Sequence, residues 1–132
     1  KKAYQDNNID YELFDFNEDI LSFMNKSNIC ITRAGASTLA ELVFLNLPHI
    51  AIPLPTAKDN HQFENASFYN QIGCNWILNQ NEINENIVAN KLSNIIDNKE
   101  EYLDKQKNMK KFSYQNTWNN VNQKIIFVIN EN

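Results

Sequence analysis

The segment 33–38, with the sequence Arg-Ala-Gly-Ala-Ser-Thr, has the side chains that could bind an anion. It joins a short apolar run to an amphipathic run, which predicts a turn from a strand into a helix. Such a turn would bring together the free N–H groups of the first helical turn, the backbone of Gly35, the hydroxyls of Ser37 and Thr38, and the guanidinium of Arg33. This combination suits a phosphate group. The structural alternative is that Ser37 or Thr38 only caps the helix.

Glu41 follows three residues after Thr38, and this spacing allows two interpretations. A Thr-x-x-Glu pattern is a capping box, in which the carboxylate bonds back to the start of its own helix. One turn into the helix, the same carboxylate could instead accept both hydroxyls of a ribose, as acidic residues do in dinucleotide-binding folds. Spacing alone does not choose between them.

Gln62 and Asn65 form a second polar group at the start of a later helix. Residues three apart share one helical face, and two carboxamides can both donate to and accept from sugar hydroxyls. The alternatives are a capping box between Asp59 and Gln62, or two solvated side chains. His61 has no acid or nucleophile at a recognisable spacing, so we expect it to support binding rather than catalysis.

Short apolar runs alternate with helical patterns, which predicts an α/β fold, a Rossmann-like parallel sheet with crossover helices. Gly35, one of two glycines, is expected to serve the backbone geometry of the first turn, and Gly73 to end a helix. A strand at 125–129 is an alternative to the last helix. The predicted strands are 11–16, 28–32, 49–52 and 75–78, and the predicted helices are 19–26, 38–46, 60–72, 84–97, 99–112 and 117–130.

Composition excludes several classes of protein. The 132 residues with 42% hydrophobic content fit one domain, and a net charge of −4 with scattered lysines argues against a nucleic-acid partner. Cys30 and Cys74 have no ligand spacing and are expected to be reduced core thiols. We predict no metal and no cofactor. No apolar run is long enough to span a membrane and no targeting pattern opens the chain, so a cytoplasmic location is expected.

Three ordered segments carry a resemblance to a known family. They are residues 16–20 (FNEDI), 33–41 (RAGASTLAE) and 59–66 (DNHQFENA). Here the sequence resembles the donor-nucleotide half of the bacterial GT-B N-acetylglucosaminyltransferases that convert lipid I to lipid II in peptidoglycan synthesis. The likeness is strongest over residues 1–79. It implies that residues 1–132 are a partial donor-nucleotide-binding domain, with a helical C-terminal part at about 83–132, from an N-terminally truncated C-terminal GT-B half.

The resemblance also implies roles for individual residues. Glu41 would hold the ribose hydroxyls, Gln62 and Asn65 the hydroxyls of N-acetylglucosamine, and the main chain at Asn17 the uracil. Ala36, Ser37 and Thr38 would bind the sugar and the pyrophosphate. Asn17 replaces the apolar residue usual at its position in that family. The full set of expected binding residues is Asn17, Arg33, Ala36, Ser37, Thr38, Glu41, Gln62 and Asn65.

The family's Gly-rich phosphate loop and its acceptor domain have no counterpart in these 132 residues. The resemblance therefore implies that the catalytic base, the lipid I site and the peripheral membrane contact lie in missing parts, and that this chain alone does not turn over. The full-length protein is expected at the cytoplasmic face of the inner membrane. The inverting reaction of the family needs no metal.

Three other hypotheses remain. The chain could be a stand-alone UDP-sugar-binding subunit that needs a membrane partner, although such a subunit should begin with its own Met, strand and Gly-rich loop. It could belong to another GT-B UDP-sugar enzyme, such as an epimerase, although the 33–41 run argues against this. It could also be a plain α/β interaction domain whose capping boxes explain every polar residue.

Overall fold

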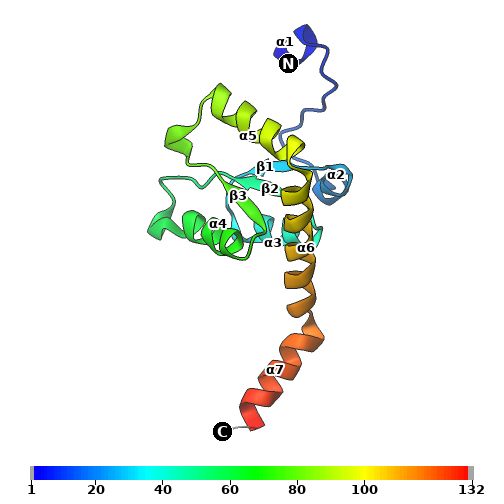
Figure 1. Ribbon diagram of the computed structural model, residues 1–132, viewed down its shortest axis with the longest axis vertical. Helices are drawn as coiled ribbons and strands as arrows, with labels where there is room; N and C mark the ends of the chain where they lie inside the picture. Colours follow the sequence, from blue (N-terminus) through cyan, green and yellow to red (C-terminus); the bar gives the residue numbers. More distant parts are fainter. Residues whose placement is uncertain (1, 131–132) are drawn as a thin grey trace.

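The computed structural model describes residues 2–130, and Figure 1 shows a small α/β body from which both ends of the chain extend. Two 3₁₀ turns, η1 and η2, follow the second and third strands. The elements in chain order are α1 (Lys2–Asp6), α2 (Ile20–Lys26), β1 (Cys30–Thr32), α3 (Ala36–Phe44), β2 (His49–Ala51), η1 (Lys58–Asn60), α4 (His61–Gln71), β3 (Asn75–Ile77), η2 (Gln80–Glu82), α5 (Glu85–Asp97), α6 (Lys99–Gln115) and α7 (Trp118–Asn130).

The three strands form one parallel sheet in the order β1-β2-β3. Cys30 is the register partner of His49, and His49 in turn is the partner of Asn75. α3 connects β1 to β2 and α4 connects β2 to β3, so each crossover is helical, as parallel pairing requires. The predicted α/β class and the parallel sheet are confirmed, and all three carboxyl ends of the strands lie at one edge.

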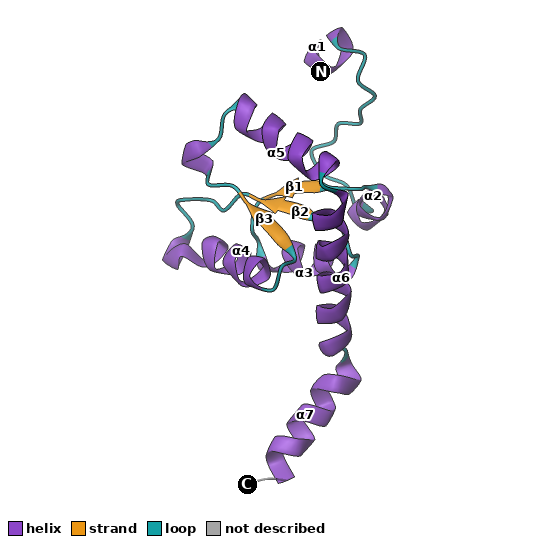
Figure 2. Cartoon of the chain, viewed as in Figure 1, coloured by secondary structure: helices purple, strands orange, loops and turns teal. Residues whose placement is uncertain are grey.

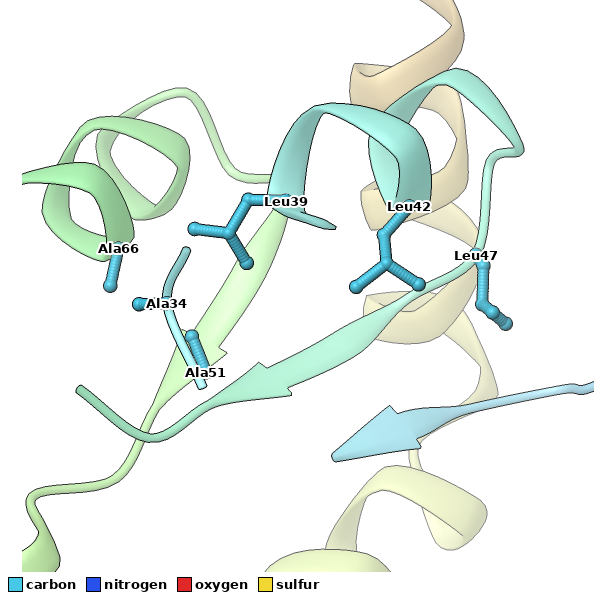
Figure 3. Close-up of a cluster of buried hydrophobic side chains, with 6 residues drawn as sticks. All are labelled: Ala34, Leu39, Leu42, Leu47, Ala51 and Ala66. Atoms are coloured by element: carbon cyan, nitrogen blue, oxygen red, sulfur yellow. The ribbon is translucent and has the colours of Figure 1, made fainter. Parts of the chain in front are cut away.

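Helices cover both faces of the sheet (Figure 2). On one face, α3 and α4 enclose a cluster of small and branched side chains, in which Leu39 and Ala66 lie close to Ala34 (Figure 3). On the other face, Ile50 and Trp76 pack against Ile95 of α5. A third cluster joins α3, β3 and α6 through Val43, Cys74 and Met109. Burial on both faces explains why β2 reads as a continuous apolar run.

The predicted strand at 11–16 is wrong. This segment has neither helix nor strand, and Leu13, Phe14 and Phe16 are 56%, 44% and 80% exposed. A strand exists only by pairing with another strand, and within residues 2–130 β1 pairs with β2 alone. The expectation of four strands is thereby reduced to three. The apolar pattern alone did not decide the conformation, because a strand also needs a neighbour to pair with, and within the described residues this segment pairs with none.

The closing helices are confirmed. α5, α6 and α7 begin and end within three residues of the predicted bounds, and 125–129 is helical rather than a strand. α7 leads away from the body at the lower end of Figure 1, and its residues 125–129 are all more than half exposed. No helix within residues 2–130 is both long and apolar enough to cross a membrane.

Gly73 has the predicted role. It follows α4 with φ +75°, the left-handed conformation that glycine adopts without steric cost. A Cβ atom there would also meet the Nδ2 atom of Asn108 at 2.5 Å. Cys74, next in the chain, is fully buried as expected, whereas Cys30 is only half-buried. Burial raises the pKa of the Cys74 thiol to about 11, so it remains a protonated apolar side chain.

Candidate functional site

The turn after β1 leads directly into α3, whose first residue is Ala36. Gly35 occupies the N-cap position, and its carbonyl accepts the first helical bond, from the N–H of Leu39. The N–H groups of Ala36, Ser37 and Thr38 have no acceptor among the described residues. This end of the helix therefore presents three unpaired donors and the positive end of the helix dipole.

The capping role suggested for Ser37, Thr38 and Glu41 is wrong. α3 begins two residues earlier than predicted, so Thr38 lies inside the first turn and cannot serve as its N-cap. The hydroxyls of Ser37 and Thr38 make no hydrogen bond within residues 2–130, and the carboxylate of Glu41 has neither a hydrogen bond nor an ion pair there. All three polar groups are left without a structural partner.

Gly35 is not needed for backbone geometry, contrary to expectation. Its φ of −68° and ψ of 138° are open to any residue. An added Cβ atom would come no closer than 3.8 Å to Thr38 Oγ1, an ordinary contact. The fold thus tolerates a side chain here. A glycine that the fold does not require leaves room in front of the open end of α3.

Gln62 is held firmly at the start of α4. Its Oε1 atom accepts two main-chain hydrogen bonds, from the N–H of Ala34 at 3.3 Å and from the N–H of Leu54 at 3.0 Å. The predicted capping box with Asp59 is wrong, because Asp59 and Asn60 both adopt the left-handed conformation and α4 has no side-chain cap. The Nε2 group of Gln62 remains a donor without a partner in the described chain.

Asn65, one turn further along α4, also binds the main chain of Ala34. Its Nδ2 atom donates to the carbonyl oxygen of Ala34 at 3.1 Å. Ala34 is fully buried, and both of its main-chain polar groups are thus bound by carboxamides of α4. The Oδ1 atom of Asn65 is left as an acceptor. Gln62 and Asn65 therefore meet at the main chain of Ala34, directly before the turn into α3.

Glu41 lies on the exposed side of α3, one turn after Ser37. Residues four apart share a face, so Glu41 and Ser37 are neighbours on it, opposite the buried Leu39, Leu42 and Val43. Glu41 thus belongs to the surface that contains the open helix end. Whether its carboxylate and the two carboxamides border one hollow stays a prediction.

Arg33, the last residue before the turn, extends its guanidinium across the carboxyl ends of the strands. Its Nη1 group donates to the carbonyl oxygen of Ile52 at 3.3 Å and to Oε1 of Gln80 at 2.5 Å. It borders a hollow of about 440 Å³ at this edge of the sheet. The Nε and Nη2 donors have no hydrogen bond within residues 2–130, so a contact with a ligand remains open to them.

Asn17 precedes α2, and its side chain serves the local turn. Its Oδ1 accepts from the N–H of Asp19 at 2.8 Å, so the side-chain oxygen is engaged, whereas its Nδ2 group makes no hydrogen bond within residues 2–130. Phe16, the residue before Asn17, is 80% exposed. The Nδ1 atom of His61 lies 2.6 Å from the carbonyl oxygen of Lys58, which makes Nδ1 the protonated nitrogen.

The electrostatic features of the interior lie away from this edge. Burial, opposed by a bond to the Leu47 carbonyl and aided by Lys105, lowers the pKa of His49 to about 4, so this imidazole is neutral. Burial also lowers the pKa of Lys105, whose ammonium donates to the carbonyl oxygen of Asn75 at 2.9 Å. Within residues 2–130, no three His, Cys, Asp or Glu side chains lie close enough to hold a metal ion.

Sequence reasoning missed Ala34, Leu54 and Gln80. The two main-chain donors that Gln62 binds belong to Ala34 and Leu54, and no side-chain pattern marks a residue that acts through its backbone. Gln80 follows β3 directly, and the carboxyl ends of parallel strands share one edge, so its place in the chain was a usable signal.

Three kinds of comparison with known proteins bear on this geometry. A model of the glycosyltransferase family 28 C-terminal domain matches residues 1–121. The crystal structure of MurG from Acinetobacter baumannii superposes with a TM-score of 0.69 at 26% sequence identity, over 83% of this chain and 33% of that chain. Each match places similar sequence or structure over most of the 132 residues.

Curated relatives carry one name, UDP-N-acetylglucosamine–N-acetylmuramyl-(pentapeptide) pyrophosphoryl-undecaprenol N-acetylglucosamine transferase. The relative from Pelagibacter ubique is 70% identical over 132 residues, which is all of this chain and 37% of that protein. The relative from Rickettsia bellii is 38% identical over 111 residues, which is 84% of this chain and 31% of that protein. The chain spans about a third of the length of these relatives.

Proposed function

The chain belongs to the glycosyltransferase family 28 C-terminal domain family, and on that premise we propose that it supplies the UDP-N-acetylglucosamine site of an inverting transferase. The complete enzyme would move N-acetylglucosamine from this donor to lipid I and make lipid II for peptidoglycan. Support comes from the name shared by its relatives and from the open helix end beside two anchored carboxamides. We propose that lipid I and the membrane are contacted by the parts of the protein outside these 132 residues, at the cytoplasmic face of the inner membrane.

The diphosphate would bind at the start of α3. The N–H groups of Ala36, Ser37 and Thr38 are unpaired, and the hydroxyls of Ser37 and Thr38 are free to donate. An anion at a helix N-terminus is stabilised by these donors and by the helix dipole. The open Nε and Nη2 groups of Arg33 would add a charge-assisted contact.

The donor sugar would bind between Gln62 and Asn65. Gln62 can offer only its Nε2 donor, because two main-chain N–H groups occupy its Oε1. Asn65 can offer its Oδ1 acceptor, because its Nδ2 is bound to Ala34. One donor and one acceptor in fixed orientations suit neighbouring sugar hydroxyls, which can each accept or donate.

The nucleoside would occupy the remaining positions. Glu41 stands unpaired on the exposed face of α3, where its two oxygens could accept both ribose hydroxyls. The main chain at Asn17 would meet the uracil, as the family resemblance implies, while the Oδ1 atom of Asn17 accepts from the N–H of Asp19. These roles, like those of the diphosphate and sugar contacts, are proposals.

The chemistry follows from where charge develops. A hydroxyl of the acceptor sugar attacks the anomeric carbon, the bond to the diphosphate oxygen breaks, and UDP leaves with additional negative charge. Fixed N–H donors at the start of α3 would stabilise that charge, since they require no reorganisation during the reaction. The base that removes the proton of the attacking hydroxyl would come from outside this chain.

One observation carries the proposal: Gln62 and Asn65 bind both main-chain groups of Ala34, immediately before the uncapped end of α3. A plain interaction domain has no need for three unpaired N–H groups, two unpaired hydroxyls and an unpaired carboxylate on one surface. Alternatives such as an epimerase would use the same donor, so the reaction itself must be measured.

A chimaera provides the test. Residues 1–132 would replace the matching 37% of the Pelagibacter ubique relative, to which they are 70% identical. We expect transfer from UDP-N-acetylglucosamine to a lipid I analogue within about tenfold of the parent enzyme, and none from the 132-residue chain alone. A folded chimaera that binds no UDP-N-acetylglucosamine, or that epimerises it instead, would overturn the proposal.

A further inference from the structure

The guanidinium of Arg33 joins the ends of all three strands. Arg33 itself follows β1, its Nη1 group donates to the carbonyl oxygen of Ile52 after β2, and the same group donates to Gln80 Oε1 after β3. The bond to Gln80 is 2.5 Å long and has a charged donor, the stronger class of hydrogen bond. No other side chain within residues 2–130 makes hydrogen bonds that join these three turns.

This bridge and the Gln62 carboxamide hold the same two segments together. Gln62 binds the N–H of Ala34, the residue after Arg33, and the N–H of Leu54, two residues after Ile52. Arg33 therefore connects the turn after β1 to the turn after β2, and Gln62 makes a second connection between the same two turns. If the guanidinium is displaced, Gln62 and Asn65 of α4 are the side chains that still hold the turn leading into α3.

Gln80 is the fixed end of the bridge. It opens η2, a short 3₁₀ turn just after β3. It lines both hollows at this edge, one of about 440 Å³ that Arg33 also borders and one of about 230 Å³ beside Leu54 and Phe63. An arginine side chain has several rotatable bonds, and without an acceptor in this position it would sample many conformations.

We propose that Gln80 is a positioning residue for the donor site, which acts through Arg33. By holding the guanidinium on Ile52, it fixes the turn before α3 at the distance from α4 that Gln62 and Asn65 need. It has no role in contacting the donor itself. The inference rests on the proposed function for its kinetic consequence, but its structural consequence can be measured without any activity.

The kinetic test compares variants of the chimaera. Gln80→Ala should raise KM for UDP-N-acetylglucosamine about three- to tenfold and change kcat by less than about twofold, because the chemical groups are intact but the site is less ordered. Gln80→Glu keeps an oxygen acceptor for Arg33 and should restore KM. The matched control is Gln71→Ala, since Gln71 is exposed on α4 and no hydrogen bond is recorded for its side chain.

A double-variant cycle tests whether Gln80 acts through Arg33. In an Arg33→Met background, Gln80→Ala should change KM by less than about twofold, because the contact it removes is already lost. An undiminished effect in that background would show that Gln80 acts by another route and would overturn the proposal. So would a Gln80→Ala enzyme with unchanged KM.

Hydrogen exchange of the 132-residue chain provides a readout independent of activity. Gln80→Ala should speed exchange of the Ala34 and Leu54 amides several-fold, whereas Gln71→Ala should leave both rates unchanged. If Gln80→Ala speeds exchange of these amides but the unsubstituted chimaera shows no transferase activity, the bridge is supported and the proposed function is contradicted. An active chimaera whose Ala34 and Leu54 amides exchange at the same rate in both variants would contradict the bridge alone.

Discussion

The helices beside the candidate site begin differently from the helices that follow the sheet. α5 is capped by Asn84, whose Oδ1 accepts from the N–H of Ile87 at 3.0 Å, and α6 is capped by Asn98, whose Oδ1 accepts from the N–H of Glu101 at 3.1 Å. α3 and α4 have no side-chain cap, although Ser37 and Thr38 stand at the start of α3.

The difference separates structural from functional polar residues. A cap satisfies a donor that would otherwise be unpaired, and losing one costs about 0.5–2 kcal/mol. α5 and α6 use this stabilisation, whereas α3 leaves it unused where it meets the carboxyl ends of the strands. In the same place, Gln62 and Asn65 each use one polar atom of the carboxamide to bind Ala34. The second polar atom of each, Gln62 Nε2 and Asn65 Oδ1, has no partner within residues 2–130.

The largest effect is expected from His49, which is fully buried in β2, the middle strand of the sheet. Protonation of His49 should destabilise the whole body, including all four helices compared above. Its pKa is about 4 in the folded chain, below the ordinary 6.5, so the unfolded chain binds the proton more tightly. The contribution of neutral His49 to the free energy of unfolding is therefore fully present above pH 6.5, and it is lost as the pH falls toward 4. We expect a loss of about 3 kcal/mol between pH 7 and pH 4.

Urea unfolding at several pH values measures this loss. His49→Asn keeps a donor for the Leu47 carbonyl but cannot be protonated, so it should remove this part of the pH dependence. His61→Asn is the matched control, because His61 is exposed, and it should retain the full slope. Equal slopes for the two variants would contradict the account.

Two substitutions of Gln62 can distinguish its structural role, which is to accept two main-chain hydrogen bonds, from its proposed role in binding the donor sugar. Gln62→Leu removes the acceptor for two main-chain N–H groups and should lower the free energy of unfolding by about 1–3 kcal/mol. Gln62→Glu keeps an acceptor oxygen for both, but it replaces the exposed donor by an acceptor. We expect near-normal stability for Gln62→Glu together with a large loss of UDP-N-acetylglucosamine affinity, measured by chemical unfolding and by titration calorimetry. Parallel losses in both properties would show that Gln62 is only structural.

The capped helices should respond in stability alone. Asn98→Ala and Asn84→Ala each remove a bonded cap and should lower the free energy of unfolding by about 1 kcal/mol. Donor affinity of the chimaera should be unchanged in both. A change in affinity would mean that α5 or α6 contributes to the site, and the distinction between the two pairs of helices would fail.

The uncapped helix should respond in the opposite way. Ser37→Ala and Thr38→Ala remove hydroxyls that have no partner, so we expect stability to change by less than about 0.5 kcal/mol. Affinity for UDP-N-acetylglucosamine should fall several-fold in each. If either variant lost as much stability as Asn98→Ala, its hydroxyl would be a cap after all.

Much of the fold was predictable because its signals are local. Apolar spacing predicted the helices α2 to α7 but not α1, it predicted three of the four proposed strands, and Gly73 marked the end of α4. The segment 11–16 was not predictable, because its conformation depends on a neighbouring strand and not on its own apolar pattern. The start of α3 was placed too late, since side-chain preferences at Ser37 and Thr38 suggested a cap that the backbone does not use.

The sequence singled out candidate site residues, but it predicted their contacts only in part. Residue types and spacing singled out Glu41, Gln62 and Asn65, and the structure brings the two carboxamides to one residue. The main-chain groups of Ala34 that they bind could not be foreseen, because a buried N–H or carbonyl has no signature in sequence. The bridge from Arg33 to Gln80 spans 47 positions and depends on the sheet order.

The central claim is that the open start of α3 and the anchored carboxamides of α4 bind one sugar nucleotide, and a crystal structure of the chimaera with UDP-N-acetylglucosamine tests it most directly. The account predicts the diphosphate on the N–H groups of Ser37 and Thr38, with Gln62 Nε2 and Asn65 Oδ1 on the sugar and Glu41 on the ribose. A nucleotide bound elsewhere, or one that leaves Glu41 and the two carboxamides facing separate surfaces, would contradict it.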